Sequence, residues 1–205
     1  MNFLNSKPEV GKKEKLVTKP SCEEAEEAVR TLLRWAGDDP SREGLLDTPS
    51  RVVRAYSEWF AGYNEDPEKI LERTFEEVAG YSEIVTLKDI RFESYCEHHL
   101  APIIGIVHVA YIPNERVVGI SKIARLVDAF SKRLQVQEKM TSQIANTLQS
   151  VLEPLGTAVL VEGDHHCMCT RGVHKTTSTM ISSAFTGDFK KKQELKNEFY
   201  KIVGK

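Results

Sequence analysis

Residues 94–99 read Ser-Tyr-Cys-Glu-His-His, and residues 164–171 read Asp-His-His-Cys-Met-Cys-Thr-Arg. Three of the four cysteines and four of the six histidines in the chain lie in these two windows. Cysteine thiolate and neutral imidazole are the ligands that Zn²⁺ prefers. Cys96, His99 and Cys167 supply three of them, the number that a catalytic zinc site uses when water holds the fourth position. The two windows therefore predict a metal site if the fold brings them together.

The spare cysteine and histidines in the windows leave two alternatives open. Cys169 or His166 would complete a closed, four-ligand structural site with no place for water. His98 and His165 stand beside the expected ligands, and a histidine pKa near ~6.5 suits proton transfer at neutral pH. The plainer alternative is that these two histidines only orient ligands. We favour acid–base work for both.

Strand and helix patterns alternate around the windows. Alternating apolar residues predict strands before the first window, across the stretch that follows it, and on both sides of the second window. Two helices are expected between these strand pairs, the first capped by Ser121, and a further helix closes the chain. This order predicts an α+β fold with an antiparallel sheet and helices on one face. The expected strands are 84–87, 90–95, 102–113, 117–120, 158–162 and 176–185, and the expected helices are 121–134, 136–151 and 189–203.

Helical patterns also precede the sheet. Ser21 and Glu24 have the spacing of a capping box, and the helix that they begin is expected to end at Gly37. Thr48 and Pro49 begin a second helix with Arg51 in its first turn, where an ion pair or a bound anion would explain the cation. We divide the chain into a flexible tail (1–20), an N-terminal helical region (21–80) and a catalytic domain (81–205).

The composition excludes several classes of protein. Of the 205 residues, 40% are hydrophobic and 28% are charged, which is typical of a globular protein rather than a disordered one. A net charge of −2 does not favour a general nucleic-acid binder. We see no apolar run long enough for a membrane span and no secretory signal. Cysteines beside histidines indicate reduced thiols, so we expect a cytoplasmic protein.

Basic side chains suggest an anionic substrate. Lys122 and Arg125 lie close to a predicted helix N-terminus, which is a plausible seat for a polyphosphate. Arg171 follows the second window, and Arg51 opens an earlier helix. Glu138 would accept two hydrogen bonds from an amidine-like N–H pair, such as the edge of guanine offers. These residues predict a hydrolase of an anionic substrate, most simply a nucleotide.

Four stretches together resemble the GTP cyclohydrolase I family, in its order and spacing. They are Ser94-x-Cys96-Glu97-His98-His99, Gly119-Ile120-Ser121-Lys122-x-x-Arg125, Leu134-Gln135-Val136-Gln137-Glu138 and His165-x-Cys167-Met168-x-x-Arg171-Gly172. The likeness extends from Thr48-Pro49-x-Arg51 to the closing helix. Each stretch alone is a weak signal, but four in register are specific.

The resemblance implies a fold, an assembly and a reaction. The fold would be the tunnelling fold, and the assembly a homodecamer of two stacked pentamers with active sites between subunits. The reaction would convert GTP and water into formate and 7,8-dihydroneopterin triphosphate, the entry to tetrahydrofolate or tetrahydrobiopterin.

The resemblance also assigns roles to residues. One Zn²⁺ per subunit would be held by Cys96, His99 and Cys167. Proton transfer would fall to His98 and His165, and Ser121 would assist the later rearrangement of the ribose. The guanine would be held by Gln137 and Glu138. The triphosphate would be met by Arg51, Lys122, Arg125 and Arg171.

Two rival functions remain at this point. A preQ₀-reductase-like enzyme of the same fold would need a nucleophilic cysteine away from metal, which the Cys-Glu-His-His cluster does not favour. A zinc-stabilised binding module would close its metal site with Cys169 or His166. The position of these two side chains is therefore the first thing to look for in the structure.

Overall fold

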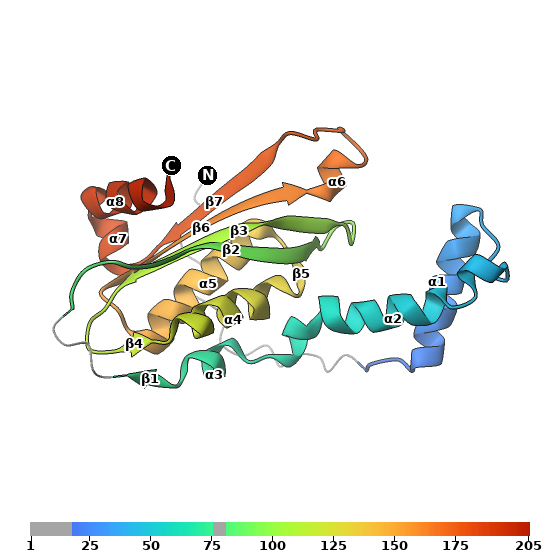
Figure 1. Ribbon diagram of the computed structural model, residues 1–205, viewed down its shortest axis with the longest axis horizontal. Helices are drawn as coiled ribbons and strands as arrows, with labels where there is room; N and C mark the ends of the chain where they lie inside the picture. Colours follow the sequence, from blue (N-terminus) through green and yellow to red (C-terminus); the bar gives the residue numbers. More distant parts are fainter. Residues whose placement is uncertain (1–17, 76–80) are drawn as a thin grey trace, which may run out of the picture. The chain divides into compact units, whose positions relative to one another are not determined.

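The computed structural model describes residues 18–75 and 81–205 (Figure 1). The chain separates into two compact units, one up to Ala55 and one from Tyr56 to Lys205. Most of the tail expected over residues 1–20 lies outside the described residues. The domain boundaries expected at residues 20 and 80 stay predictions.

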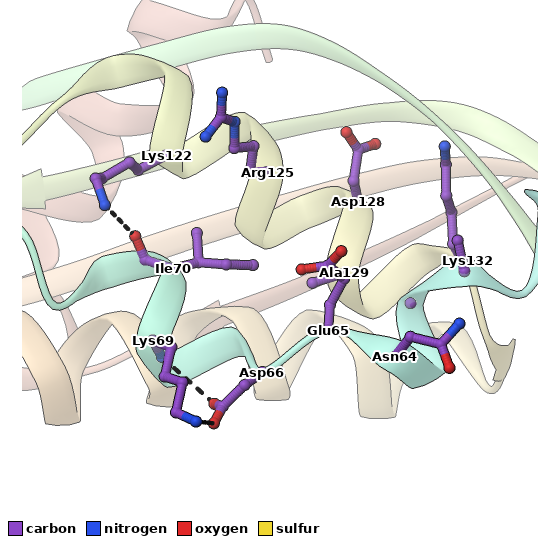
Figure 2. A pocket seen from close by; sticks show the side chains of 12 residues that line it. Asn64, Glu65, Asp66, Lys69, Ile70, Lys122, Arg125, Asp128, Ala129 and Lys132 are labelled. Carbon is purple, nitrogen blue, oxygen red and sulfur yellow. Dashed lines mark hydrogen bonds and ion pairs between the residues drawn. The ribbon is translucent and has the colours of Figure 1, made fainter.

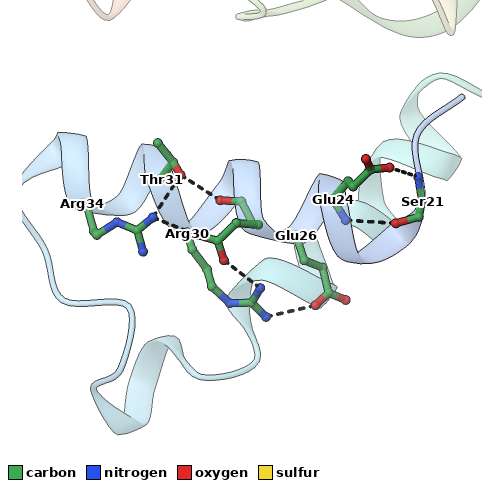
Figure 3. A network of polar contacts seen from close by, with 7 residues as sticks. Ser21, Glu24, Glu26, Arg30, Thr31 and Arg34 are labelled. Atoms are coloured by element: carbon green, nitrogen blue, oxygen red, sulfur yellow. Dashed lines mark hydrogen bonds and ion pairs between the residues drawn. The ribbon is translucent and has the colours of Figure 1, made fainter. Parts of the chain in front are cut away.

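The first unit is helical. It contains α1 (Cys22–Ala36), the 3-10 turn η1 (Glu43–Leu45) and the first part of α2 (Thr48–Trp59). The capping box is confirmed, because Glu24 N–H donates to Ser21 Oγ and Ser21 N–H donates to the Glu24 carboxylate (Figure 3). Gly37 ends α1 at φ 95°, a conformation that glycine adopts without steric cost.

The second unit is built on a five-stranded sheet in the order β5-β2-β3-β6-β7. All neighbours are antiparallel except β2 and β5, which pair in parallel over two residues. The helices α4 (Ile120–Ser131) and α5 (Gln137–Leu152) follow the pair β2–β3 and precede the pair β6–β7 in the chain. This confirms the α+β class and the arrangement expected of the tunnelling fold. The sheet strands are β2 (Val85–Cys96), β3 (Pro102–Ile112), β5 (Leu134–Gln135), β6 (Gly156–His165) and β7 (Thr179–Phe185).

The remaining elements of this unit are short or helical. They are η2 (Ala61–Asn64), α3 (Pro67–Leu71), β1 (Thr74–Phe75), β4 (Val117–Val118), α4 (Ile120–Ser131), α5 (Gln137–Leu152), α6 (His166–Cys169), α7 (Gly187–Lys191) and α8 (Gln193–Val203). Within the described residues, no helix has the length and apolar character needed to cross a membrane.

Successive side chains of the central strands point to opposite faces of the sheet, and each face has its own hydrophobic core. Val107 and Val109 of β3 face α4 and α5, together with buried side chains such as Leu126 and Ile144. Ala110 lies on the other face, in a smaller core with Phe189 of α7 and Phe199 of α8. Figure 1 shows α7 and α8 on the opposite side of the sheet from α4 and α5. The expectation of helices on one face only was therefore wrong for the C-terminal helices.

Local details also differ from the expected elements. Ser121 does not cap α4: Gly119 is the N-cap residue, and Ser121 lies exposed in the first turn. The strand at 117–118 does not return along β3 but pairs with β1. The two strands expected over 84–95 are one strand with an irregularity between Leu87 and Ile90, where Asp89 has φ 60°. Propensity does not reveal these choices, because each depends on a partner strand far away in the sequence.

Gly105 provides a stability test of the central strands. A Cβ at this position would overlap the main-chain carbonyl oxygen of Glu162 on β6, which cannot turn away as a side chain would. We expect Gly105→Ala to lower the free energy of unfolding by about 3 kcal/mol, the upper part of the usual range for overpacking. Gly119→Ala is the matched control, since its Cβ would meet only Phe75 Cε2 at 3.9 Å. Denaturant unfolding at fixed protein concentration measures both, and equal losses would refute the packing argument.

Candidate active site

The register of the sheet brings the two windows together. At one end of β3, Pro102 pairs with Tyr95 of β2, and Ile103 pairs with His165 of β6. Cys96 follows Tyr95 directly and Cys167 follows His165 by two residues, so both flank the same end of β3. This end of the sheet is called the metal end below.

A tight turn adds the histidine ligand. After β2, the main-chain N–H groups of His99 and Leu100 both donate to the carbonyl oxygen of Cys96, and Leu100 adopts φ 54°. This turn folds His99 back over Cys96. One ligand atom from each of Cys96, His99 and Cys167 lies within 4.8 Å of the other two. The predicted grouping of these three residues is therefore present in the fold.

The donor set fits a zinc ion. Both cysteines are buried, at 5% and 8% exposure, whereas His99 is open to solvent. The separation of 3.9 Å between Cys96 Sγ and His99 Nδ1 is close to the roughly 3.5–3.8 Å expected for neighbouring ligands of a tetrahedral zinc. Two soft thiolates and one imidazole also suit zinc better than magnesium or calcium.

The thiols are influenced by burial and by one another. Burial, followed by the neighbouring Cys96 thiol, raises the pKa of Cys167, while the Arg171 guanidinium lowers it. A cysteine must lose its proton to bind a metal, so metal binding at this site releases protons and weakens as the pH falls.

The other residues of the windows take different positions. His98 Nδ1 lies 3.6 Å from Cys96 Sγ, but this exposed histidine does not belong to the group of three. Cys169 is turned toward the carbonyl oxygen of Lys175, at 3.5 Å, and His166 is half-buried. Neither of these two residues joins the group of three.

His165 is half-buried beside the ligands and contacts α5. Its Nε2 lies 2.9 Å from Gln137 Oε1. Burial lowers the pKa of His165, and the charges of Glu138 and Asp164 oppose this shift. A lowered pKa favours the neutral form of the ring. Glu138 is exposed, whereas Gln137 is only 1% exposed.

The predicted phosphate-binding cations are not all at the metal end. Arg171 does lie at the metal end, where its Nη1 is 3.2 Å from His99 Nε2. Lys122 and Arg125 line a pocket of about 780 Å³ between α4 and the segment η2–α3, where Lys122 Nζ donates to the carbonyl oxygen of Ile70 at 2.6 Å (Figure 2). None of the residues Cys96, His99 and Cys167 lines this pocket.

Helix α4, which lines the pocket, begins toward the end of the sheet opposite the metal end. β4 follows Ile112, which pairs with Gly156 at the end of the sheet away from His165, and α4 begins directly after β4. The chain leaving α4 forms β5, which pairs with Cys96. Lys122 thus lies roughly 14 Å along the helix axis from the last residue of α4, at 1.5 Å per residue. Figure 1 shows α6 and the start of α4 at opposite ends of this unit.

Arg51 belongs to the first unit, where it pairs with Asp47 at 3.1 Å. The ion pair that the sequence offered as an explanation for this cation is thus present. A role of Arg51 toward phosphate stays a prediction.

The sequence did not point to the partners of Gln137. Its side chain reaches β6 and β7, including Ser182. The i, i+4 spacing of Gln137 and Thr141 on α5 was the available signal, but the strand residues that they meet come more than twenty positions later.

Comparison with known proteins identifies the family. The family model for GTP cyclohydrolase I matches residues 25–204. A GTP cyclohydrolase 1 of Maricaulis maris is 60% identical over 186 residues, which cover 91% of each chain. One of Allorhizobium ampelinum is 61% identical over 173 residues, covering 84% of this chain and 86% of the other. The family model covers most of this chain, and the chain also has the Cys96, His99 and Cys167 group. This chain belongs to the GTP cyclohydrolase I family.

Proposed function

We propose that this chain hydrolyses GTP to formate and 7,8-dihydroneopterin triphosphate, the first step of pterin synthesis, with one Zn²⁺ per subunit. Membership of the GTP cyclohydrolase I family supports the reaction. The grouping of Cys96, His99 and Cys167 within 4.8 Å supports the metal and is the observation that carries the proposal. A preQ₀-reductase-like function is excluded by the family.

Cys96, His99 and Cys167 would hold the zinc, and the chemistry that the zinc would supply is the activation of water. Zn²⁺ held by Cys96, His99 and Cys167 would lower the pKa of a bound water to roughly 7, so that attack on guanine C8 proceeds at neutral pH. The rival zinc-stabilised module needs a fourth protein ligand. The position of Cys169 does not support this module, because the Cys169 sulfur contacts the carbonyl oxygen of Lys175.

The proposal assigns proton transfer to two histidines. His98 lies beside Cys96, and His165 stands next to the ligand window with a pKa lowered by burial. A neutral His165 accepts a proton first and returns it to the ring nitrogen that becomes the leaving group as the C8–N bond opens. Glu138 is exposed, so the proposal gives its carboxylate the N–H edge of guanine. Its charge also acts on the pKa of His165, which indicates that the two residues are near one another.

The triphosphate needs several cations, and one subunit does not collect them at its own metal end. Lys122, Arg125 and Ser121 lie on the first half of α4, toward the far end of the sheet. We therefore propose that a second copy of the chain brings its Lys122, Arg125 and Ser121 to the metal end of the first. Active sites between subunits of a homodecamer would satisfy this requirement, with Arg171 from the metal end and Arg51 completing the phosphate contacts.

Mixing two inactive variants tests both the reaction and the shared site. We expect the wild-type chain to release formate from GTP, and Lys122→Ala and Cys167→Ala each to lose most of this activity. Joint refolding of the two variants creates some sites with an intact metal group and an intact lysine, so part of the activity returns.

The outcomes separate the two parts of the proposal. Absence of formate from the wild-type, metal-loaded chain would overturn the reaction. Formate from the wild type without any recovery in co-refolded variants would overturn the shared site. The double variant Lys122→Ala/Cys167→Ala, refolded with wild type at matched ratios, controls for losses during refolding.

A further inference from the structure

The side-chain amide of Gln137 has a fixed orientation. Its Nε2 donates to the carbonyl oxygens of Val161 and Met180, at 3.2 and 3.0 Å, and to Ser182 Oγ at 3.1 Å. A carbonyl oxygen only accepts hydrogen bonds, so an amide turned by 180° would place oxygen against oxygen at two positions. The NH₂ group must therefore face β6 and β7.

Two hydroxyl groups support the same orientation. Thr141 Oγ1 donates to the main-chain carbonyl of Gln137 at 2.7 Å, which uses its only proton. The contact of 2.7 Å between Thr141 and Ser182 must then use the Ser182 proton. Ser182 Oγ is left to accept from the Gln137 amide. Gln137, Thr141 and Ser182 thus form a closed ring of hydrogen bonds, in which the two amide protons of Gln137 are shared among three acceptors.

The orientation of the amide decides the proton position on His165. Gln137 Oε1 faces His165 Nε2 at 2.9 Å, and an amide oxygen can only accept. We infer that Gln137 is a positioning residue for His165, which holds the ring as the Nε2–H tautomer and leaves Nδ1 as the nitrogen that exchanges protons with the substrate. This inference rests on the proposed function, in which His165 moves protons.

The arrangement suits a residue that both accepts and returns a proton. When Nδ1 takes up a proton, Nε2 keeps its own and still donates to Gln137, so the ring need not turn during the cycle. The hydrogen bond therefore preserves the alignment of Nδ1 with the reacting atoms. If Nε2 instead accepted a hydrogen bond from a donor group, Nδ1 would carry the proton in the neutral ring. Protonation of Nε2 would then break that hydrogen bond.

This role differs from the guanine contact that the family resemblance implies for Gln137. The side chain is 1% exposed, and its amide already has four partners within the chain. The neighbouring Glu138 is exposed and carries the charge that an amidine edge prefers. Guanine recognition through side chains is then left to Glu138.

Gly163 on β6 makes room for the contact. A Cβ at this position would lie 2.6 Å from Gln137 Oε1 and 3.0 Å from Ile103 Cγ2. The amide oxygen is the far end of a flexible side chain, so it would move before the strands did. Gly163→Ala therefore displaces the oxygen from His165 without removing the amide.

A double-mutant cycle tests the inference by activity. We expect Gln137→Met to lower kcat by about 10- to 100-fold, the cost of a slightly misplaced catalytic group, with KM for GTP close to wild type. In a His165→Ser background the same change should cost nothing further, because Gln137 acts through His165. A raised KM for GTP in both backgrounds would instead show a direct substrate contact and overturn the inference.

A matched variant controls for loss of stability. Gln135 is also a buried glutamine, at 3% exposure, and its amide donates to the carbonyl oxygen of Phe130 at 2.7 Å. Gln135→Met should lower the unfolding temperature as Gln137→Met does while leaving kcat near the wild-type value. If both variants lose kcat equally, Gln137 is only a structural residue and the inference fails.

Nuclear magnetic resonance with ¹⁵N-labelled histidine reads the tautomer without turnover. The ring signals of His165 are assigned by their loss in His165→Ser. We expect a protonated Nε2 and a bare Nδ1 in the wild type, and a mixture of tautomers in Gln137→Met and Gly163→Ala. A wild-type signal from Nδ1–H would overturn the inference, whereas a wild-type chain that shows Nε2–H but releases no formate would overturn only the proposed function.

Discussion

Replacing Cys167 by alanine is expected to abolish both metal binding and formate release from GTP. Cys167 is 8% exposed, and its ligand atom belongs to the group of three that lies within 4.8 Å. Loss of a residue that only supports a ligand costs metal affinity about 10- to 100-fold, so loss of a ligand itself should cost more. Metal content by atomic emission and formate release measure the two losses on the same sample.

Cys169→Ala is the control for the Cys167 prediction. Cys169 is two residues away, and its sulfur contacts the carbonyl oxygen of Lys175. We expect this variant to retain about one metal ion per chain, as a site with three protein ligands and a water requires. Loss of metal from Cys169→Ala, with retention in Cys167→Ala, would show that the ligand assignment is wrong.

Much of the metal site could be predicted from the sequence, because its signal is local. Cys96 and His99 are three residues apart on one turn, and few other arrangements of thiol and imidazole satisfy a metal. Strand patterns on both sides of each window then placed the two windows at strand ends. Only their meeting required the structure, since it depends on the register of β2 and β6 against β3.

Features that depend on distant partners were beyond the sequence. Ser121 precedes Lys122 and looks like a helix cap, but the N-cap residue is Gly119, two residues earlier, next to the strand β4 that pairs with β1. The amide of Gln137 has its partners on strands that follow it by more than twenty residues. The position of Lys122 far from the metal end is a property of helix direction, which a motif does not report. These are long-range choices, and local propensity does not decide them.

Replacing His165 by serine is expected to leave the metal in place and to lower formate release by about 10²- to 10⁴-fold, the usual contribution of a general acid–base residue. His165 lies outside the group of three ligands. Burial lowers the pKa of His165, which favours the neutral ring that can accept a proton. Serine is too weak a base to replace it. Metal analysis and single-turnover formate release on the same preparation measure the two properties separately.

His166→Ser distinguishes a specific role from the general effect of losing a histidine near the metal. The two residues are neighbours and are both half-buried, but His165 alone of the pair ends β6 and meets Gln137. We expect His166→Ser to keep both metal and most activity. If His165→Ser lost the metal, His165 would be a ligand and the open fourth position would disappear. If His166→Ser lost the activity instead, His166 and not His165 would transfer the proton. The hydrogen bond to Gln137 would then position a histidine that takes no part in the reaction.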